Sequence, residues 1–252
     1  MMKDSSRSLG RPIELRKGSE IQLSPDLHIK WVGLRERMLV EATLDEIIPN
    51  YIRWPQFNKK DGPFPKDPQI VDQMGEIIAH VFGPTKPTHI FGIMDAGEDI
   101  TWSVAKHMKM NNKQVIFSRK LQGNPIEFTG PHYLARSYKS SVGQTASGQG
   151  EVYMSSYLFP PGSRVLITDD VVALLGVGGP AIRKLLSQGV KVVGFAMGLG
   201  KMHQGWSEDL KTIEPHVVAF PVVRVANIQY ANGQSGVGSI ILTPQRQALQ
   251  LV

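Results

Sequence analysis

The chain of 252 residues contains no cysteine. This absence excludes disulfides, a thiolate nucleophile, cysteine-ligated zinc and iron–sulfur clusters, and it suits a reducing compartment. Long hydrophobic runs are also missing, since the longest charge-free apolar stretch, Val171–Ile182, is shorter than the ~18 residues of a membrane span. The first residues, MMKDSSRSLG, lack the apolar core of a secretion signal. We therefore expect a cytoplasmic protein that has no membrane partner.

The chain has 28 Lys and Arg against 22 Asp and Glu, which gives a formal net charge of +6. A positive excess suits an anionic partner, either the phosphates of a small ligand or a nucleic-acid backbone. We do not expect a nucleic-acid partner, because no recognition helix or aromatic-rich RNA-binding motif is recognisable. The seven histidines form no HExxH-like pair, so a histidine metal site is not expected either.

Short apolar runs alternate with helical segments through the middle of the chain. The segment that follows Asp67 repeats apolar residues at helical spacing, and further helices are expected at Ile100–Met108 and Pro180–Leu186. The apolar runs expected to form strands are Thr88–Ile93, Val115–Phe117, Val165–Thr168 and Val190–Met197. Strands of this kind, separated by helices, predict an α/β fold with a parallel sheet covered by helices on both faces.

The two ends of the chain read differently from the middle. Arg11–Leu39 alternates apolar with polar residues around Ser24-Pro25-Asp26, which predicts short strands joined by a turn. We therefore expect an N-terminal β-rich extension (1–50), an α/β core (51–215) and a C-terminal β-rich hood or cap (216–252). The polar stretch Gly123–Gly150 is too long for an idle connection and is expected to be a mobile functional loop.

Ligands of open parallel sheets bind at the carboxyl ends of the strands. Three groups of residues follow predicted strands there: Asp95-Ala96-Gly97, Arg119-Lys120 and Asp169-Asp170. Adjacent carboxylates can accept hydrogen bonds from a sugar diol or hold Mg²⁺, although they can also simply cap a turn. A glycine-rich loop before a helix, such as the one that contains Gly176 and Gly178, can present backbone N–H groups to a phosphate.

These segments together resemble a known family. PGSRVLITDDVVALLGVGGPAIRKLLSQGVKVVGFAM resembles the phosphoribosyl-pyrophosphate motif of the type I phosphoribosyltransferases. FGIMDAGEDITWSVAKHM resembles the pyrophosphate loop and helix of that family, and IFSRKLQGNP resembles a strand end of its xanthine and adenine members. GKMHQGWSEDL and RVANIQYANG resemble later segments of the xanthine enzymes. The resemblance covers approximately Pro65 to Gly233.

The resemblance implies an activity and a role for each motif. Such enzymes transfer ribose 5-phosphate from phosphoribosyl pyrophosphate to a nucleobase, here a purine, with Mg²⁺ held mainly through the substrate. Asp169 and Asp170 would bind the ribose hydroxyls, and Lys201 would lie near the purine. The remaining implied substrate contacts are Asp95, Ala96, Gly97, Arg119 and Lys120 for pyrophosphate, and Ala173, Leu174, Leu175, Gly176, Val177 and Gly178 for the 5-phosphate. A homodimer is implied by analogy.

The phosphate loop departs from the family pattern and keeps a second function open. Leu174, Leu175, Gly176 and Val177 stand where the family has glycines and hydroxyl residues, so two hydroxyl donors are missing. A hydrogen bond to a charged group contributes ~1.5–3 kcal/mol. The alternative is therefore a catalytically impaired, regulatory protein that binds phosphoribosyl pyrophosphate or a nucleotide. Gly200, which replaces a glutamate of the xanthine-type segment, leaves the choice of base open as well.

Overall fold

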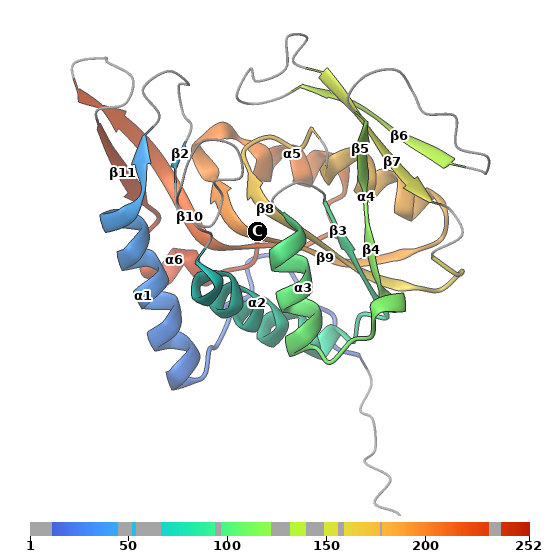
Figure 1. The fold of residues 1–252 in the computed structure, drawn as a ribbon, viewed down its shortest axis with the longest axis horizontal. Coiled ribbons are helices and arrows are strands. Elements are labelled where there is room, and N and C mark those ends of the chain that lie inside the picture. Colours follow the sequence, from blue (N-terminus) through green and yellow to red (C-terminus); the bar gives the residue numbers. More distant parts are fainter. Residues whose placement is uncertain are drawn as a thin grey trace, which may run out of the picture.

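The computed structural model describes residues 12–44, 52–53, 67–93, 97–121, 132–139, 149–155, 159–176, 178–231 and 238–252 (Figure 1). The helices are α1 (Pro25–Glu41), α2 (Pro68–Phe82), α3 (Gly97–His107), α4 (Gly178–Ser187), α5 (Trp206–Ile213) and α6 (Gln245–Ala248). The strands are β1 (Thr43–Leu44), β2 (Ile52–Arg53), β3 (His89–Gly92), β4 (Val115–Phe117), β5 (Arg119–Leu121), β6 (His132–Lys139), β7 (Gln149–Ser155), β8 (Arg164–Val172), β9 (Lys191–Lys201), β10 (Ala219–Tyr230) and β11 (Gly238–Leu242). Short 3₁₀ helices are η1 (Gly83–Thr85), η2 (Asn112–Gln114) and η4 (Met202–Gln204).

A six-stranded sheet in the order β11-β10-β9-β8-β3-β4 forms the centre of the molecule. All neighbouring strands in it are parallel except β11, which pairs antiparallel with β10. The expected α/β class and parallel sheet are therefore confirmed. Parallel strands have their carboxyl ends at one edge of the sheet, so residues that follow β3, β4, β8 and β9 meet there.

Helices cover both faces of this sheet (Figure 1). Helices α1, α2 and α3 pack on one face, and α4 and α5 pack on the other. The alternation of side chains along a strand divides the core accordingly. In β8, for example, Leu166 contributes to the cluster under α1–α3, whereas Ile167 contributes to the cluster under α4 and α5. The expected amphipathic helix after Asp67 is α2, and its apolar face is buried.

The short strands expected across Arg11–Leu39 are wrong for most of that range, because Pro25–Glu41 forms helix α1. Ser24 is the N-cap and its hydroxyl accepts the Leu27 N–H at 3.4 Å, while Pro25 occupies the first helical position. Serine at the N-cap and proline at the first helical position favour a helix start, although both residues are also common in turns. The buried side chain of Trp31 then fixes α1 to the sheet, since its indole N–H donates to the Val222 carbonyl at 2.8 Å.

The polar stretch Gly123–Gly150 is not simply a loop. It contains β6 and the first residues of β7, which pair antiparallel in a separate three-stranded sheet of order β5-β7-β6. At the other end of the chain, the strands expected after residue 216 are present as β10 and β11. Since β10 pairs with β9 in the central sheet, the C-terminal strands continue that sheet. The division of the chain at residues 50 and 215 stays a prediction.

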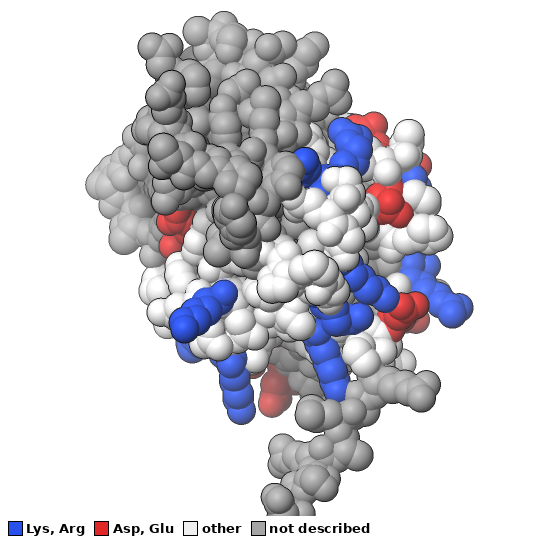
Figure 2. All heavy atoms as spheres, turned by 90° about the vertical axis from the view of Figure 1, so that its right-hand side faces the viewer, with Lys and Arg blue, Asp and Glu red and all other residues white. Residues whose placement is uncertain are grey.

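The basic side chains are spread over the described part of the face shown in Figure 2 and do not form one continuous patch. Lys and Arg side chains lie on the lower and right-hand parts of its described surface, and Asp and Glu side chains stand between several of them (Figure 2). Within the described ranges, no helix has the length and apolar character needed to span a bilayer.

Candidate active site

The acidic pair Asp169–Asp170 lies inside β8, near its carboxyl end. The parallel ladder with β9 continues through the pair, with Asp169 opposite Met197 and Val172 opposite Gly200. The prediction that the strand ends before the pair is therefore wrong by several residues. Asp169 is 9% exposed and its Oδ1 accepts a hydrogen bond from the Asp170 N–H at 2.9 Å. Asp170 is half-buried.

Helix α3 begins directly against this pair. A Cβ atom on Gly97, the first helical residue, would lie 3.4 Å from both the Asp169 Cα and the Asp170 nitrogen. The Thr101 hydroxyl donates to the Gly97 carbonyl at 2.7 Å and lies 2.8 Å from the Thr168 hydroxyl, so a buried link fixes α3 to β8. The positive end of the α3 dipole is thereby brought to two carboxylates. The structure thus brings together two of the motifs that the sequence separates by about 70 residues.

Residues Ala173–Gly176 form the turn that leaves β8. Ala173 and Leu175 are buried, whereas the Leu174 side chain is 40% exposed. Gly176 is half-buried. Because Leu175 packs into the core beneath α4, its side chain is not available to a ligand. Of the two leucines that replace family residues in this loop, only Leu174 presents its side chain to solvent.

Gly178 opens α4 and has a structural role of its own. A Cβ atom there would lie 2.8 Å from the Phe195 ring on β9, so the start of α4 can approach the sheet only because this residue has no side chain. The Gly179 N–H donates to the Leu175 carbonyl at 3.0 Å, which joins the helix start to the preceding turn. The N-terminus of α4 thus follows the β8 turn closely, as a phosphate-binding helix would require.

Lys201 ends β9 and is only 3% exposed. Its strand position lies opposite Val225 of β10. Burial lowers the pKa of Lys201 to about 8, and the negative charge of Asp170 opposes that shift. The structure therefore places a shielded cation within electrostatic reach of the acidic pair.

His203 is a candidate that the sequence did not single out. It lies in η4, two residues after Lys201, and its ring is partly buried. Burial is the main cause that lowers the pKa of His203; interaction with the Val225 backbone raises it, and the Lys201 charge lowers it. Its position directly after the end of β9 is the sequence signal that points to this residue.

Several predicted site residues are not tested by the structure. Asp95, Ala96 and Val177 lie outside the described residues. Arg119 and Lys120 begin β5 and pair with β7, so they open a strand of the second sheet rather than a loop. Their side chains lie outside what the structure describes, and their contact with pyrophosphate stays a prediction.

The acidic pair fits a divalent ion only in combination with other ligands. Among the described residues, no three His, Asp or Glu side chains are grouped so as to hold a metal ion. Mg²⁺ is commonly held by one or two carboxylates together with substrate phosphates and water. Asp169 and Asp170 suit that arrangement, in which the substrate completes the coordination.

Comparison with known proteins agrees with this geometry. No protein-family model matches the chain. The chain is 28% identical over 161 residues to a xanthine phosphoribosyltransferase from Deinococcus deserti, an alignment that covers 64% of this chain and 76% of the relative.

Solved structures with the same fold are adenine phosphoribosyltransferases. The enzyme from Rhodothermus marinus has 22% identity and a TM-score of 0.55, and the match covers 77% of this chain and 99% of that one. The enzyme from Trypanosoma brucei, solved with AMP, pyrophosphate and ribose 5-phosphate, has 17% identity and a TM-score of 0.58, with 81% and 82% covered. The resemblance to the type I phosphoribosyltransferases, and to their purine members, is therefore confirmed.

Proposed function

We propose that the protein transfers ribose 5-phosphate from phosphoribosyl pyrophosphate to a purine base and releases pyrophosphate, a purine-salvage reaction. One observation carries this proposal: the start of α3, the acidic pair of β8 and Lys201 of β9 meet at the carboxyl edge of one parallel sheet. The similarity to purine phosphoribosyltransferases supports the same reaction.

Each group has a physical task in this reaction. Asp169 and Asp170 accept hydrogen bonds from the 2′- and 3′-hydroxyls of the ribose and hold the sugar in place. The transition state resembles an oxocarbenium ion, which the two nearby carboxylates stabilise through their negative charge. The 5-phosphate binds to backbone N–H groups of the turn after β8 and of the α4 N-terminus.

The departing pyrophosphate needs positive charge on the side of the sugar away from the 5-phosphate. The N-terminus of α3 at Gly97 supplies the positive end of a helix dipole there, and Asp95, Ala96, Arg119 and Lys120 are proposed as further contacts. Mg²⁺, when bound between the acidic pair and the substrate, would neutralise part of the pyrophosphate charge.

Lys201 suits an oxopurine better than adenine. Its ammonium group is a hydrogen-bond donor that burial shields from water. Xanthine, hypoxanthine and guanine carry a carbonyl oxygen that accepts such a bond, whereas adenine carries an amino group that would face the ammonium donor to donor. We therefore propose an oxopurine as the accepting base.

The first test mixes the purified protein with Mg²⁺, phosphoribosyl pyrophosphate and each of xanthine, guanine, hypoxanthine and adenine. Pyrophosphate release is expected with at least one oxopurine. The double variant D169N/D170N should weaken binding of phosphoribosyl pyrophosphate about 100-fold or more, because two charge-assisted hydrogen bonds are lost.

The matched control is E208Q/D209N, which neutralises another adjacent acidic pair. Glu208 and Asp209 are exposed in the first turn of α5, so this variant should bind phosphoribosyl pyrophosphate like the wild type. Unchanged affinity of D169N/D170N in a calorimeter would remove the acidic pair from the site.

A regulatory protein of the same fold is the second candidate. The exposed apolar side chain of Leu174, where a hydroxyl donor is expected, favours it. Measurable binding of phosphoribosyl pyrophosphate without turnover of any base would support this alternative. Under the enzymatic proposal, the variant L174T/V177T is expected to raise turnover, because it restores two hydroxyls to the phosphate loop.

We further propose that the protein works in the cytoplasm as a homodimer. The cysteine-free composition supports a reducing compartment. Light scattering coupled to size exclusion is expected to give the mass of two chains, and a single-chain mass at micromolar concentration would contradict the dimer.

A further inference from the structure

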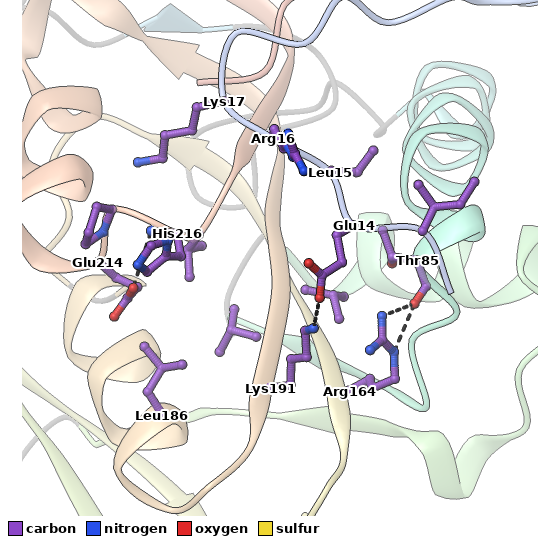
Figure 3. A pocket seen from close by; sticks show the side chains of 15 residues that line it. Glu14, Leu15, Arg16, Lys17, Thr85, Arg164, Leu186, Lys191, Glu214 and His216 are labelled. Carbon is purple, nitrogen blue, oxygen red and sulfur yellow. Dashed lines mark hydrogen bonds and ion pairs between the residues drawn. The ribbon is translucent and has the colours of Figure 1, made fainter. Parts of the chain in front are cut away.

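A cavity of about 570 Å³ lies at the amino ends of the parallel strands, away from the candidate active site (Figure 3). Its wall includes Arg164, the first residue of β8, and Lys191, the first residue of β9. Asp169 follows Arg164 by five residues on β8, which is about 16 Å along an extended strand. The cavity is therefore separate from the groups proposed to bind phosphoribosyl pyrophosphate.

The N-terminal segment 13–17 crosses this cavity like a strap. The Ile13 N–H donates to the Pro84 carbonyl at 3.0 Å, and the Gly18 N–H donates to the Leu251 carbonyl at 2.8 Å. Between these attachments, Glu14 forms an ion pair with Lys191 on the sheet (Figure 3). The strap is thus held at both ends and at Glu14, and its side chains form one wall of the cavity.

The cavity is lined by more basic than acidic side chains. The basic residues are Arg16, Lys17, Arg164 and Lys191, and the acidic residues are Glu14 and Glu214. Some of these charges are already used: Lys191 pairs with Glu14, and the Arg164 guanidinium donates to the Thr85 carbonyl. The lining therefore carries more positive than negative charge even when the ion pair between Lys191 and Glu14 is counted.

Lys17 is the informative member of this set. Its Nζ is shielded from solvent and has no hydrogen-bond partner among the described residues. Figure 3 shows the side chain extending to the side of the cavity where Glu214 and His216 lie. Burial lowers the pKa of Lys17; the Lys211 charge adds to that shift, and Glu214 and Glu208 oppose it. A shielded ammonium group without a hydrogen-bond partner is unfavourable, and a bound anion would relieve that cost.

The rest of the wall is apolar. Leu15 of the strap, Leu186 of α4, and Val192, Val193 and Val217 at the sheet edge contribute to it. The volume falls within the range of small-molecule pockets and far exceeds the space of a single phosphate ion. We propose that this cavity binds a mononucleotide-sized organic phosphate, with the phosphate at Lys17 and the ring system against the apolar wall.

The test measures binding of AMP and GMP by calorimetry in the full-length D169N/D170N variant, which weakens the contribution of the proposed catalytic site. At least one nucleotide is expected to bind, and inorganic phosphate or adenosine alone should bind more weakly. Adding K17Q should weaken nucleotide binding about tenfold or more, because a charge-assisted contact is lost. K17R should largely retain it.

K113Q is the matched control, since Lys113 is an exposed lysine that does not line the cavity. It should leave nucleotide affinity unchanged. The proposal is overturned if neither nucleotide binds at millimolar concentration, if K17Q changes affinity no more than K113Q does, or if inorganic phosphate binds as tightly as the nucleotides. Because pyrophosphate release is measured separately, failure of this proposal is distinguishable from failure of the proposed catalytic function.

Discussion

Replacing Lys201 by methionine should stabilise the protein while it damages the site. Lys201 is 3% exposed, and the burial of its ammonium group lowers its pKa from 10.5 to about 8. Methionine has a similar length and no charge, so K201M keeps most of the packing and removes the buried cation. Groups whose charge is costly in the folded state are typical of functional sites.

The size and pH dependence of the effect follow from the pKa. A decrease from 10.5 to about 8 corresponds to ~3 kcal/mol of unfolding free energy. Between these two pKa values the unfolded chain holds the proton and the folded chain does not, so the stability of the wild type rises with pH. The destabilisation by Lys201 is full below pH 8 and is lost as the pH approaches 10.5. The advantage of K201M should therefore be ~3 kcal/mol at pH 7 and less than ~1 kcal/mol at pH 10.

Urea denaturation of both proteins at pH 7 and pH 10 measures this difference. Titrations elsewhere in the chain occur in both proteins and cancel in the comparison. Lys113, an exposed lysine, provides the control, and K113M should change stability by less than ~0.5 kcal/mol at either pH. A destabilised K201M at pH 7, or an advantage that does not shrink with pH, would refute the argument that the buried charge is costly. K201M is also expected to lose oxopurine turnover.

Further predictions concern the elements that position the site. L175A should lower the unfolding free energy by ~2–5 kcal/mol, whereas L174A should change it little in the same denaturation experiment, because only Leu175 is buried. G75A should destabilise by ~1–3 kcal/mol, since a Cβ on α2 would overlap Ser103 of α3; a wild-type melting curve would contradict that close contact. T168V should cost ~1 kcal/mol through the lost hydroxyl contact with α3, and calorimetry should show weaker binding of phosphoribosyl pyrophosphate as α3 loosens.

The centre of the fold could be predicted because its strands are nearly continuous apolar runs. β3, β4, β8 and β9 each overlap the run expected from the sequence, since the part of a strand that is covered on both faces is mainly apolar. The start of α1 could not be predicted in the same way. Ser24, Pro25 and Asp26 suit a turn and a helix N-terminus equally, so the choice depended on the period of the residues that follow. Trp31 and Met38, both buried on α1, belong to that helical period.

The candidate site was predicted by order of motifs, and its geometry required the structure. Gly97 lies against the acidic pair because β3 and β8 are neighbours in the sheet. No local sequence pattern reveals that two strands are neighbours. The continuation of β8 through Asp169 and Asp170 was missed because carboxylates ordinarily mark the end of a buried strand. The strand β6 was missed because its polar composition gives no clear alternation.

Comparison among the lysines separates structural from functional roles. Lys30 forms an ion pair with Glu76, and Lys191 forms one with Glu14. Both lysines remain partly exposed, as is common for surface ion pairs. Lys17 and Lys201 differ from these surface lysines, because burial is the main cause that lowers the pKa of each. For Lys201 the charge of Asp170 opposes the cost of burial, whereas the Lys17 ammonium has no hydrogen-bond partner among the described residues, so only a bound anion or polar ligand would compensate for its lost hydration. Lys201 belongs to the proposed catalytic site by its position near the acidic pair. Lys17 lines a cavity at the opposite edge of the sheet, and its ammonium group without a hydrogen-bond partner among the described residues is the reason to assign it to a second site.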